Sequence, residues 1–335
     1  MSKIAVLGAG SWGIALSVLL TDNSHHVALW EVDSDQAGRL ETEREDKQKL
    51  PGIKIPTQVK ITTDLEEAVL DRDLLALALP SHVVREVAQK LAKIRLDNPL
   101  ILNLAKGIET RTLCRMSEVL KQELPEKLHN NICTLSGPSH AEEVSRKIAT
   151  SVVVAGFKEE TAQRIQEVFM NSYFRVYTNS DLVGVELGGS LKNIIAIASG
   201  ICDGLGLGDN TKGALLTRGL AEMMRLAEKL GAKSSTLAGL SGMGDLITTC
   251  ISKYSRNRFV GEEIGKGKTL SEVIKNMVMV AEGIKTTESA YKLGQKYQVE
   301  MPITEQMYKI LFENKNPKAA VLDLMKRDPK SEIWS

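Results

Sequence analysis

The sequence predicts an α/β protein in which a doubly wound sheet forms the N-terminal part and helices alone form the C-terminal part. Short apolar runs alternate with helical periods over the first half of the chain. A glycine-rich turn follows the first apolar run, and from about residue 181 long helical periods replace the β-branched runs. We therefore expect two domains in these 335 residues, 1–181 and 182–335, at about 100–200 residues per domain.

Eight apolar runs are expected to form strands: residues 3–7, 26–30, 59–63, 74–80, 100–107, 132–138, 150–156 and 174–179. Helical periods occur at residues 12–23, 82–94, 213–232, 269–278, 286–298 and 303–315. The alternation of strands and helices favours a parallel sheet. Residues 191–200 read as a buried helix that follows an expected turn at Gly188-Gly189-Ser190, and the polar tail 326–335 is expected to fray.

Composition and charge argue against several classes of protein. The 43 basic and 42 acidic side chains leave a formal charge of +1, so no generally basic surface for nucleic acid is expected. Four cysteines without a C-x-x-C pair and five histidines without ligand spacing argue against a disulfide framework and a metal site. The longest apolar run, residues 74–79, is far shorter than the ~20 residues that span a bilayer. We expect a cytoplasmic protein without membrane insertion.

The segment GAGSWG, which follows the first expected strand and opens a helix, predicts a dinucleotide site and hence a Rossmann-like domain. Gly8 would allow the tight turn, Gly10 would let the backbone approach a pyrophosphate, and Gly13 would let helix and strand pack closely. Glu31 and Asp33 come about 20 residues later, where a carboxylate can bind ribose hydroxyls. Solvated loop acids are the alternative for these two residues.

Two further loops follow expected strands, whose carboxyl ends face the ligand crevice of such sheets. Lys106 lies in the first of them, and a solvated loop lysine is the alternative. In the second, Gly137 and Ser139 form a tight turn before a helix, which suits an oxygen-rich ligand but also an ordinary capped helix start. His140 is interpreted as a packing or solvent-facing residue rather than a base.

A lysine within a buried helical segment is the most informative single residue. Burial of Lys192 would be unfavourable unless the ammonium is paired, and a desolvated lysine exchanges a proton near neutral pH. A lysine that reaches solvent through an interdomain cleft is the alternative. Nearby in sequence, Asp245 follows a Gly-x-Gly turn, and the segment Ser255-Arg256-Asn257 opens a helix as a candidate phosphate clamp.

These motifs together resemble one family, the bacterial-type NAD(P)-dependent sn-glycerol-3-phosphate dehydrogenases. The shared segments are GAGSWG, AKGIE, SGPSHAEEV, VELGGSLKNIIAIASGICDGLGLGDNTKGALLTRGLAEM, GMGDLITTC, SRNR and AEGIKTT, in the family's order from residue 8 to residue 287. The resemblance covers essentially the whole chain.

The resemblance implies reversible hydride transfer between NAD(P) and C2 of glycerol 3-phosphate, favouring reduction of dihydroxyacetone phosphate and supplying phospholipid synthesis. It implies that Lys192 is the proton donor or acceptor and that no metal is needed, and a homodimer is expected. The implied substrate contacts are Lys106, Gly137, Ser139, Lys192, Asn193, Asp245, Thr249, Ser255, Arg256 and Asn257. The implied cofactor contacts, beside the glycines, are Ser11, Trp12, Lys106, Ala141, Arg256, Val280 and Glu282.

The chain departs from the family's pattern after the second expected strand. A histidine or arginine is frequent there, whereas this chain has Glu31-Val32-Asp33 without positive charge, and further on it has Asp46 in place of asparagine and Lys49 in place of an aromatic residue. We therefore expect NADH to be preferred over NADPH. A dehydrogenase of 3-hydroxy acids and a dinucleotide-binding sensor without catalysis are the alternative functions.

Overall fold

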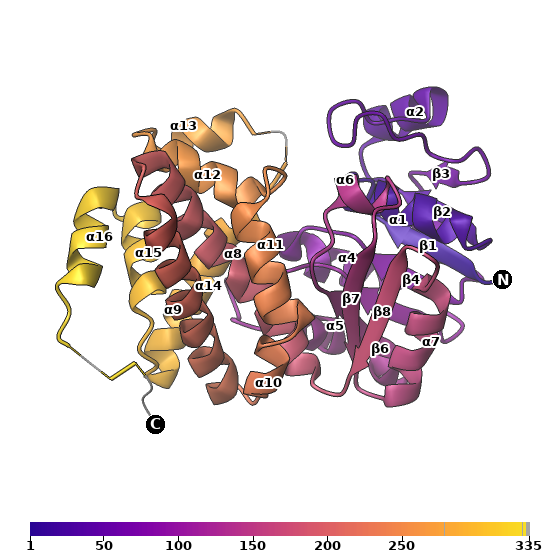
Figure 1. The fold of residues 1–335 in the computed structure, drawn as a ribbon. Helices are drawn as coiled ribbons and strands as arrows, with labels where there is room; N and C mark the ends of the chain where they lie inside the picture. The colour runs from indigo at the N-terminus through magenta and orange to yellow at the C-terminus, as the bar shows by residue number, and fades with distance from the viewer. Residues whose placement is uncertain (278, 330, 333–335) are drawn as a thin grey trace.

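The computed structural model describes residues 1–277, 279–329 and 331–332. An eight-stranded sheet region and a region built from helices lie side by side, with the N-terminus at the far edge of the sheet region (Figure 1). Each region has a buried apolar core of its own. Residue 278, at the end of one expected helix, and part of the polar tail lie outside the described residues.

The sheet contains β1 Lys3–Leu7, β2 His26–Trp30, β3 Lys60–Thr62, β4 Leu74–Leu77, β5 Leu100–Asn103, β6 Ile132–Ser136, β7 Thr150–Gly156 and β8 Phe174–Asn179. Their spatial order is β3-β2-β1-β4-β5-β6-β7-β8. The first six strands have the doubly wound order with parallel neighbours, so the strand order reverses between β1 and β4. Ligands bind at this switch point in such sheets.

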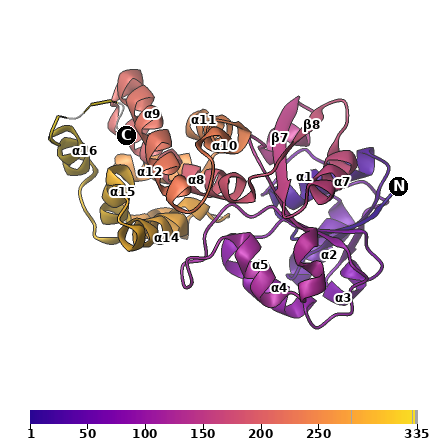
Figure 2. The same ribbon diagram turned by 90° about the horizontal axis from the view of Figure 1, so that it is seen from below.

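Helices cover both faces of the sheet, which explains why its strands read as continuous apolar runs. The helices are α1 Ser11–Asp22, α2 Ser34–Glu43, α3 Leu65–Val69, α4 Val84–Leu91, α5 Met116–Glu123, α6 Ala141–Val144 and α7 Glu159–Phe169. α1 and α7 pack on one face, while α4 and α5 lie on the other (Figure 2).

One strand departs from the expected parallel arrangement, because β7 pairs with β6 in antiparallel register. A parallel return needs a crossover that carries a helix across the face of the sheet. The connection from β6 to β7 contains only the four-residue α6, so the chain turns back along the edge, and β8 then pairs parallel to β7.

The helical region contains α8 Leu182–Leu205, α9 Gly208–Lys229, α10 Ser234–Leu237, α11 Asp245–Ile251, α12 Arg256–Gly265, α13 Leu270–Lys275, α14 Glu282–Tyr297, α15 Pro302–Phe312 and α16 Pro317–Met325. α8 is the only described helix long and apolar enough to span a membrane by length and composition, and 94% of its apolar window is buried. Helices α9, α10, α11, α12, α14 and α15 pack around α8, while α13 packs on α12 and α16 packs on α15.

The expected turn at residues 188–190 is wrong, because these residues lie within α8. A Cβ on Gly188 would lie 2.8 Å from the Ser241 carbonyl oxygen, and a Cβ on Gly189 would lie 2.4 Å from the Ser136 Oγ. The two glycines therefore let α8 approach the end of β6 and the π-helical turn at Leu240–Gly244. Close packing outweighs their poor helix propensity.

α8 and α12 touch through glycines on both helices. A Cβ on Gly200 of α8 would lie 1.9 Å from the Arg258 carbonyl oxygen, and one on Gly261 of α12 would lie 1.9 Å from the Ile197 carbonyl oxygen. Neither position has room for a methyl group. The two backbones are in direct contact and are fixed relative to one another.

A buried carboxylate joins the start of α8 to the sheet region. Glu186 pairs with Arg115 at 2.6 Å and accepts a hydrogen bond from the Ser117 backbone N–H at 2.8 Å. Burial raises the pKa of Glu186, and the Arg115 guanidinium opposes that shift. These contacts hold α8 against α5, on whose first turn Ser117 lies.

Candidate functional site

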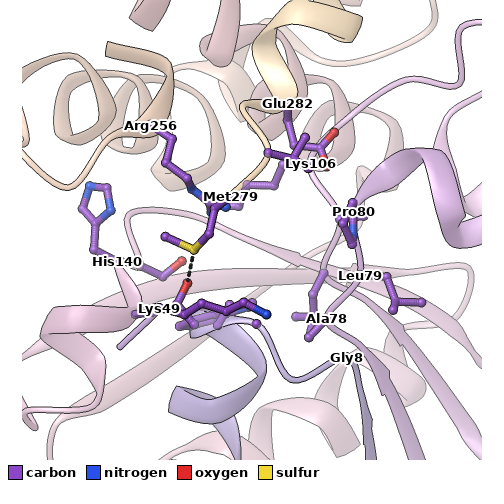
Figure 3. Close-up of a pocket in the computed structure, with 18 of the residues that line it drawn as sticks. Gly8, Lys49, Ala78, Leu79, Pro80, Lys106, His140, Arg256, Met279 and Glu282 are labelled. Carbon is purple, nitrogen blue, oxygen red and sulfur yellow. Dashed lines mark hydrogen bonds between the residues drawn. The ribbon is translucent and has the colours of Figure 1, made fainter. Parts of the chain in front are cut away.

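A cavity of about 500 Å³ lies between the two regions, at the carboxyl ends of the parallel strands (Figure 3). Seventeen of the residues expected to form the site line it: Gly8, Gly10, Ser11, Trp12, Glu31, Lys106, Ser139, Ala141, Lys192, Asn193, Asp245, Thr249, Ser255, Arg256, Asn257, Val280 and Glu282. Gly13, Asp33 and Gly137 are not in the lining. The fold thus brings together residues that lie up to 274 positions apart in sequence, from Gly8 to Glu282.

The glycine loop after β1 has the geometry that a dinucleotide pyrophosphate requires. Gly8 has a φ of +106°, and a Cβ there would lie 2.7 Å from the Ala78 carbonyl oxygen. A Cβ on Gly13 would lie 1.9 Å from the Gly8 carbonyl oxygen, so this glycine serves helix packing. Gly10 caps α1 without a side-chain hydrogen bond, and a Cβ added there would meet no atom within 4 Å. The backbone N–H groups at the start of α1 are open to an anion.

Glu31 and Asp33 occupy different positions at the end of β2. Glu31 is 9% exposed, lines the cavity, and accepts hydrogen bonds from the backbone N–H groups of Ala9 at 3.2 Å and Asp33 at 3.1 Å. Asp33 instead caps α2 by accepting from the N–H groups of Asp35 and Gln36. Of the two carboxylates, only that of Glu31 therefore reaches the cavity.

Three charged side chains, from α8, α11 and the loop after β5, meet in the cavity. The Lys192 Nζ lies 2.5 Å from the Asp245 Oδ1, and the Lys106 Nζ lies 2.7 Å from the Asp245 Oδ2. The Thr249 Oγ1 accepts a further hydrogen bond from Lys192 at 2.6 Å. Lys106 also donates to the Gly137 carbonyl at 2.9 Å. Gly137 is thus outside the lining but contacts a lysine that lines the cavity.

The environment changes the proton affinity of this cluster. Burial lowers the pKa of Lys192 to about 8, and the Lys106 ammonium adds to that shift while the Asp245 carboxylate opposes it. Burial alone would raise the pKa of Asp245, but the two ammonium groups hold it below its usual value. Asp245 is therefore an anion, while Lys192 can exchange a proton near neutral pH.

A chain of amide hydrogen bonds lies beside the cluster. Asn193 donates to the Lys106 carbonyl at 3.2 Å, and its Oδ1 accepts from the Asn257 Nδ2 at 2.9 Å. The Asn257 Oδ1 in turn accepts from the Gly283 N–H at 2.9 Å. This chain connects the loop after β5 with the starts of α12 and α14.

Arg256 is the first residue of α12, whose N-cap is Ser255. Arg256 lines the cavity. The protein that surrounds its guanidinium on the other sides lowers the pKa of Arg256 by partial burial. The carboxylates of Glu282 and Glu142 oppose that shift. A cation at an open helix start is suited to an anionic group such as a phosphate.

The segment before α14 covers the glycine loop. The Met279 Sδ accepts from the Ser11 Oγ at 3.7 Å (Figure 3), and Glu282 accepts from the Ser81 backbone N–H at 2.9 Å and from the Ser81 hydroxyl. Neither Ser81 nor Met279 was expected at the site from the sequence. Ser81 had a signal, because it follows β4 at the point where the strand order reverses.

The lining also includes His140, Gln36 and Lys49, which were not assigned to the site from sequence. Burial lowers the pKa of His140 to about 4, so its imidazole is neutral. No group of three or more His, Cys, Asp or Glu side chains among the described residues is arranged to hold a metal ion.

Comparisons with known proteins show the family of the chain. Sequence profiles described as the N-terminus and the C-terminus of NAD-dependent glycerol-3-phosphate dehydrogenase match residues 3–163 and 181–322. The NAD(P)+ glycerol-3-phosphate dehydrogenase of Thermoanaerobacter sp. strain X514 is 53% identical over 331 residues, 99% of each chain. That of Fusobacterium nucleatum is 50% identical over 335 residues, 100% of each chain.

A solved structure gives the same result for the fold. The glycerol-3-phosphate dehydrogenase of Coxiella burnetii has a TM-score of 0.92 at 37% identity, covering 97% of this chain and 99% of that one. The similarity therefore extends over both regions. The chain belongs to the NAD-dependent glycerol-3-phosphate dehydrogenase family.

Proposed function

We propose that the protein catalyses the reversible, NAD(P)-dependent interconversion of dihydroxyacetone phosphate and sn-glycerol 3-phosphate. One observation carries this proposal: Lys192, paired with Asp245, shares a cavity with Arg256 and with an open glycine-loop helix start. These groups match the three demands of the reaction, which are a proton, a phosphate site and a dinucleotide site.

Lys192 is the proposed general acid and base. The nicotinamide supplies or accepts the hydride when the cofactor is bound. In the direction of reduction the Lys192 ammonium donates a proton to the alkoxide that develops at C2, and in the reverse direction the neutral amine removes the hydroxyl proton. A pKa of about 8 leaves both forms accessible near neutral pH.

The neighbours of Lys192 are proposed to hold it and to orient the substrate. Asp245 and Thr249 fix the position of the Nζ, because both bond to it. Lys106 bridges the Asp245 carboxylate and the Gly137 carbonyl, and Asn193 bonds to the Lys106 backbone. The second ammonium near the reacting oxygen would help to polarise the carbonyl.

The substrate phosphate is proposed to bind at the start of α12. Arg256 would pair with it, with Ser255 and Asn257 beside it on the same turn. Ser139, whose hydroxyl donates to the Gly137 carbonyl at 2.9 Å, would hold the substrate from the sheet region. The cofactor is proposed to contact Gly8, Gly10, Ser11, Trp12, Glu31, Lys106, Ala141, Arg256, Val280 and Glu282.

NADH is the proposed preferred cofactor. Glu31 reaches the cavity after β2, where a carboxylate accepts hydrogen bonds from ribose hydroxyls and repels a 2′-phosphate. Asp33, which the sequence had also suggested for this task, adds its negative charge from the cap of α2. Titration of both cofactors at saturating dihydroxyacetone phosphate tests this; a higher kcat/KM with NADPH would refute it.

The activity itself is tested by the loss of NADH absorbance on addition of dihydroxyacetone phosphate. A 3-oxo acid and a blank without substrate are the comparison arms. Turnover only with dihydroxyacetone phosphate supports the proposal. Turnover with the oxo acid would favour a hydroxy-acid dehydrogenase, and NADH binding without turnover of either substrate would favour a sensor.

We further propose the organisation that surrounds this activity. The domain boundary is put at residues 181/182, supported by the end of β8 at Asn179 and the start of α8 at Leu182. A cytoplasmic homodimer that supplies glycerol 3-phosphate for phospholipids is proposed. Light scattering of the purified chain would test the dimer, and fractionation of cells would test the location.

A further inference from the structure

We propose that Lys49 determines how far the protein accepts a phosphate ester at the 2′ position of the cofactor's adenine ribose. The Lys49 ammonium is then the counter-charge that keeps NADPH usable beside the preferred NADH. The inference rests on the proposed function, because it assigns one end of the cavity to the adenine ribose.

Lys49 lines the cavity on the side of the glycine loop (Figure 3). Its Nζ lies 2.5 Å from the Gln36 Oε1, and the Gln36 Nε2 donates to the Ala9 carbonyl at 2.8 Å. The Ala9 N–H donates to Glu31 at 3.2 Å. A single hydrogen-bonded chain thus connects the carboxylate after β2, the glycine loop and the Lys49 ammonium.

The backbone around Lys49 is also fixed. The Asp46 Oδ1 accepts from the backbone N–H groups of Gln48 at 3.0 Å and Lys49 at 2.9 Å. The Asp46 Oδ2 lies 3.4 Å from the Gln36 Nε2. Lys49 is therefore held at both its backbone and its ammonium, which reduces the entropy lost when it binds an anion.

Among the described residues, no other lysine or arginine of the cavity lining is available for this task. The lining contains Lys106 and Lys192, which share Asp245, and Arg256, which lies at the start of α12. Arg44, which could have approached from the neighbouring loop, donates to the Val59 carbonyl and pairs with Glu41. Arg39 is exposed and is not in the lining.

Glu31 and Lys49 would then act as an opposed pair. The carboxylate favours ribose hydroxyls, while the ammonium offsets its repulsion of a 2′-phosphate. The preference for NADH should therefore be moderate, and removal of the Lys49 charge should make it strong. The loss of positive charge immediately after β2 is compensated by a lysine 16 positions after Asp33.

The test compares binding of 2′,5′-ADP with binding of 5′-ADP by calorimetry, which needs no catalysis. Lys49→Gln should raise the Kd for 2′,5′-ADP by about tenfold and change the Kd for 5′-ADP by less than about twofold. Lys49→Arg should restore binding of 2′,5′-ADP. Lys47→Gln is the matched control, because Lys47 pairs with Glu43 at the surface and should change neither Kd.

Equal effects of Lys49→Gln on both nucleotides, or no effect on 2′,5′-ADP, would overturn the proposal. Wild-type protein that does not bind 2′,5′-ADP would overturn it as well. Failure of the proposed function is distinguishable, since it would appear as absent reduction of dihydroxyacetone phosphate while the two nucleotides still bind with the expected Lys49 dependence.

Discussion

The Lys192 Nζ lies 2.5 Å from the Asp245 Oδ1, and both side chains are buried between the two regions. Burial disfavours the ammonium and Asp245 favours it, so the Lys192 pKa reaches about 8 rather than a still lower value. The acid strength of Lys192, the proposed proton donor, therefore depends on a neighbouring charge.

Lys192→Ala should lower kcat by about 10²–10⁴, because the alkoxide at C2 would lose its proton donor. Steady-state rates with dihydroxyacetone phosphate measure this. The melting temperature and the Kd for NADH should stay close to those of wild type, since Asp245 keeps Lys106 as a partner. A variant that retains a quarter of wild-type kcat would exclude Lys192 as the proton donor.

The pH dependence should have opposite signs in the two directions. Reduction needs the Lys192 ammonium, so its kcat should fall as pH rises through about 8, and oxidation needs the neutral amine, so its kcat should rise over the same interval. Asp245→Asn removes the group that favours the ammonium. The alkaline limb of reduction should then move to lower pH by about one unit or more. An unchanged limb in this variant would mean that another group titrates.

Arg256→Ala should raise KM for dihydroxyacetone phosphate by the equivalent of about 2–4 kcal/mol, because the phosphate would lose its charged partner. Unphosphorylated dihydroxyacetone, a poor substrate for wild type, should show little further loss. Arg258→Ala is the matched control, since Arg258 lies on the same helix and pairs with Asp203. Equal losses on both substrates would assign Arg256 another role.

Two glycines of the same loop should respond differently to a methyl group. Gly10→Ala meets no atom within 4 Å, so the free energy of unfolding should change little while the Kd for NADH rises. Gly13→Ala places its Cβ 1.9 Å from the Gly8 carbonyl oxygen and should lower the free energy of unfolding by about 2 kcal/mol or more. Denaturant titration and NADH fluorescence measure the two effects. Destabilisation by Gly10→Ala comparable to that of Gly13→Ala would contradict this view of the loop.

The positions of strands could be predicted well where polar or turn residues flank the apolar run on both sides. The bounds of β1, β2, β7 and β8 agree with the expected 3–7, 26–30, 150–156 and 174–179. The expected runs 74–80, 100–107 and 132–138 extend beyond the observed strands. The residues after the end of each strand no longer pair with a neighbouring strand and belong to loops that line or support the cavity. Apolar runs also do not reveal direction, so the reversal at β7 could not be predicted.

The candidate site could be predicted where a motif carries its own chemistry, as in the glycine loop and around Lys192. Lys49 reaches the cavity only through the path of the folded chain, which no local pattern indicates. The glycines at 188 and 189 suggested a turn, because sequence shows their flexibility but not the neighbouring backbone and side chain that exclude a Cβ.

The direct contact of α8 with α12 has a consequence for the size of molecule that can react. Lys192 belongs to α8 and Arg256 belongs to α12. The close contact of these helices at Gly200 and Gly261 therefore sets the backbone positions from which the proposed proton donor and the proposed phosphate-binding cation extend. In the proposed binding mode, a substrate with its phosphate on Arg256 would present to Lys192 a carbon at a limited number of bonds from that phosphate. Selection of the substrate by chain length would then depend on the packing of two helices, away from the atoms that react.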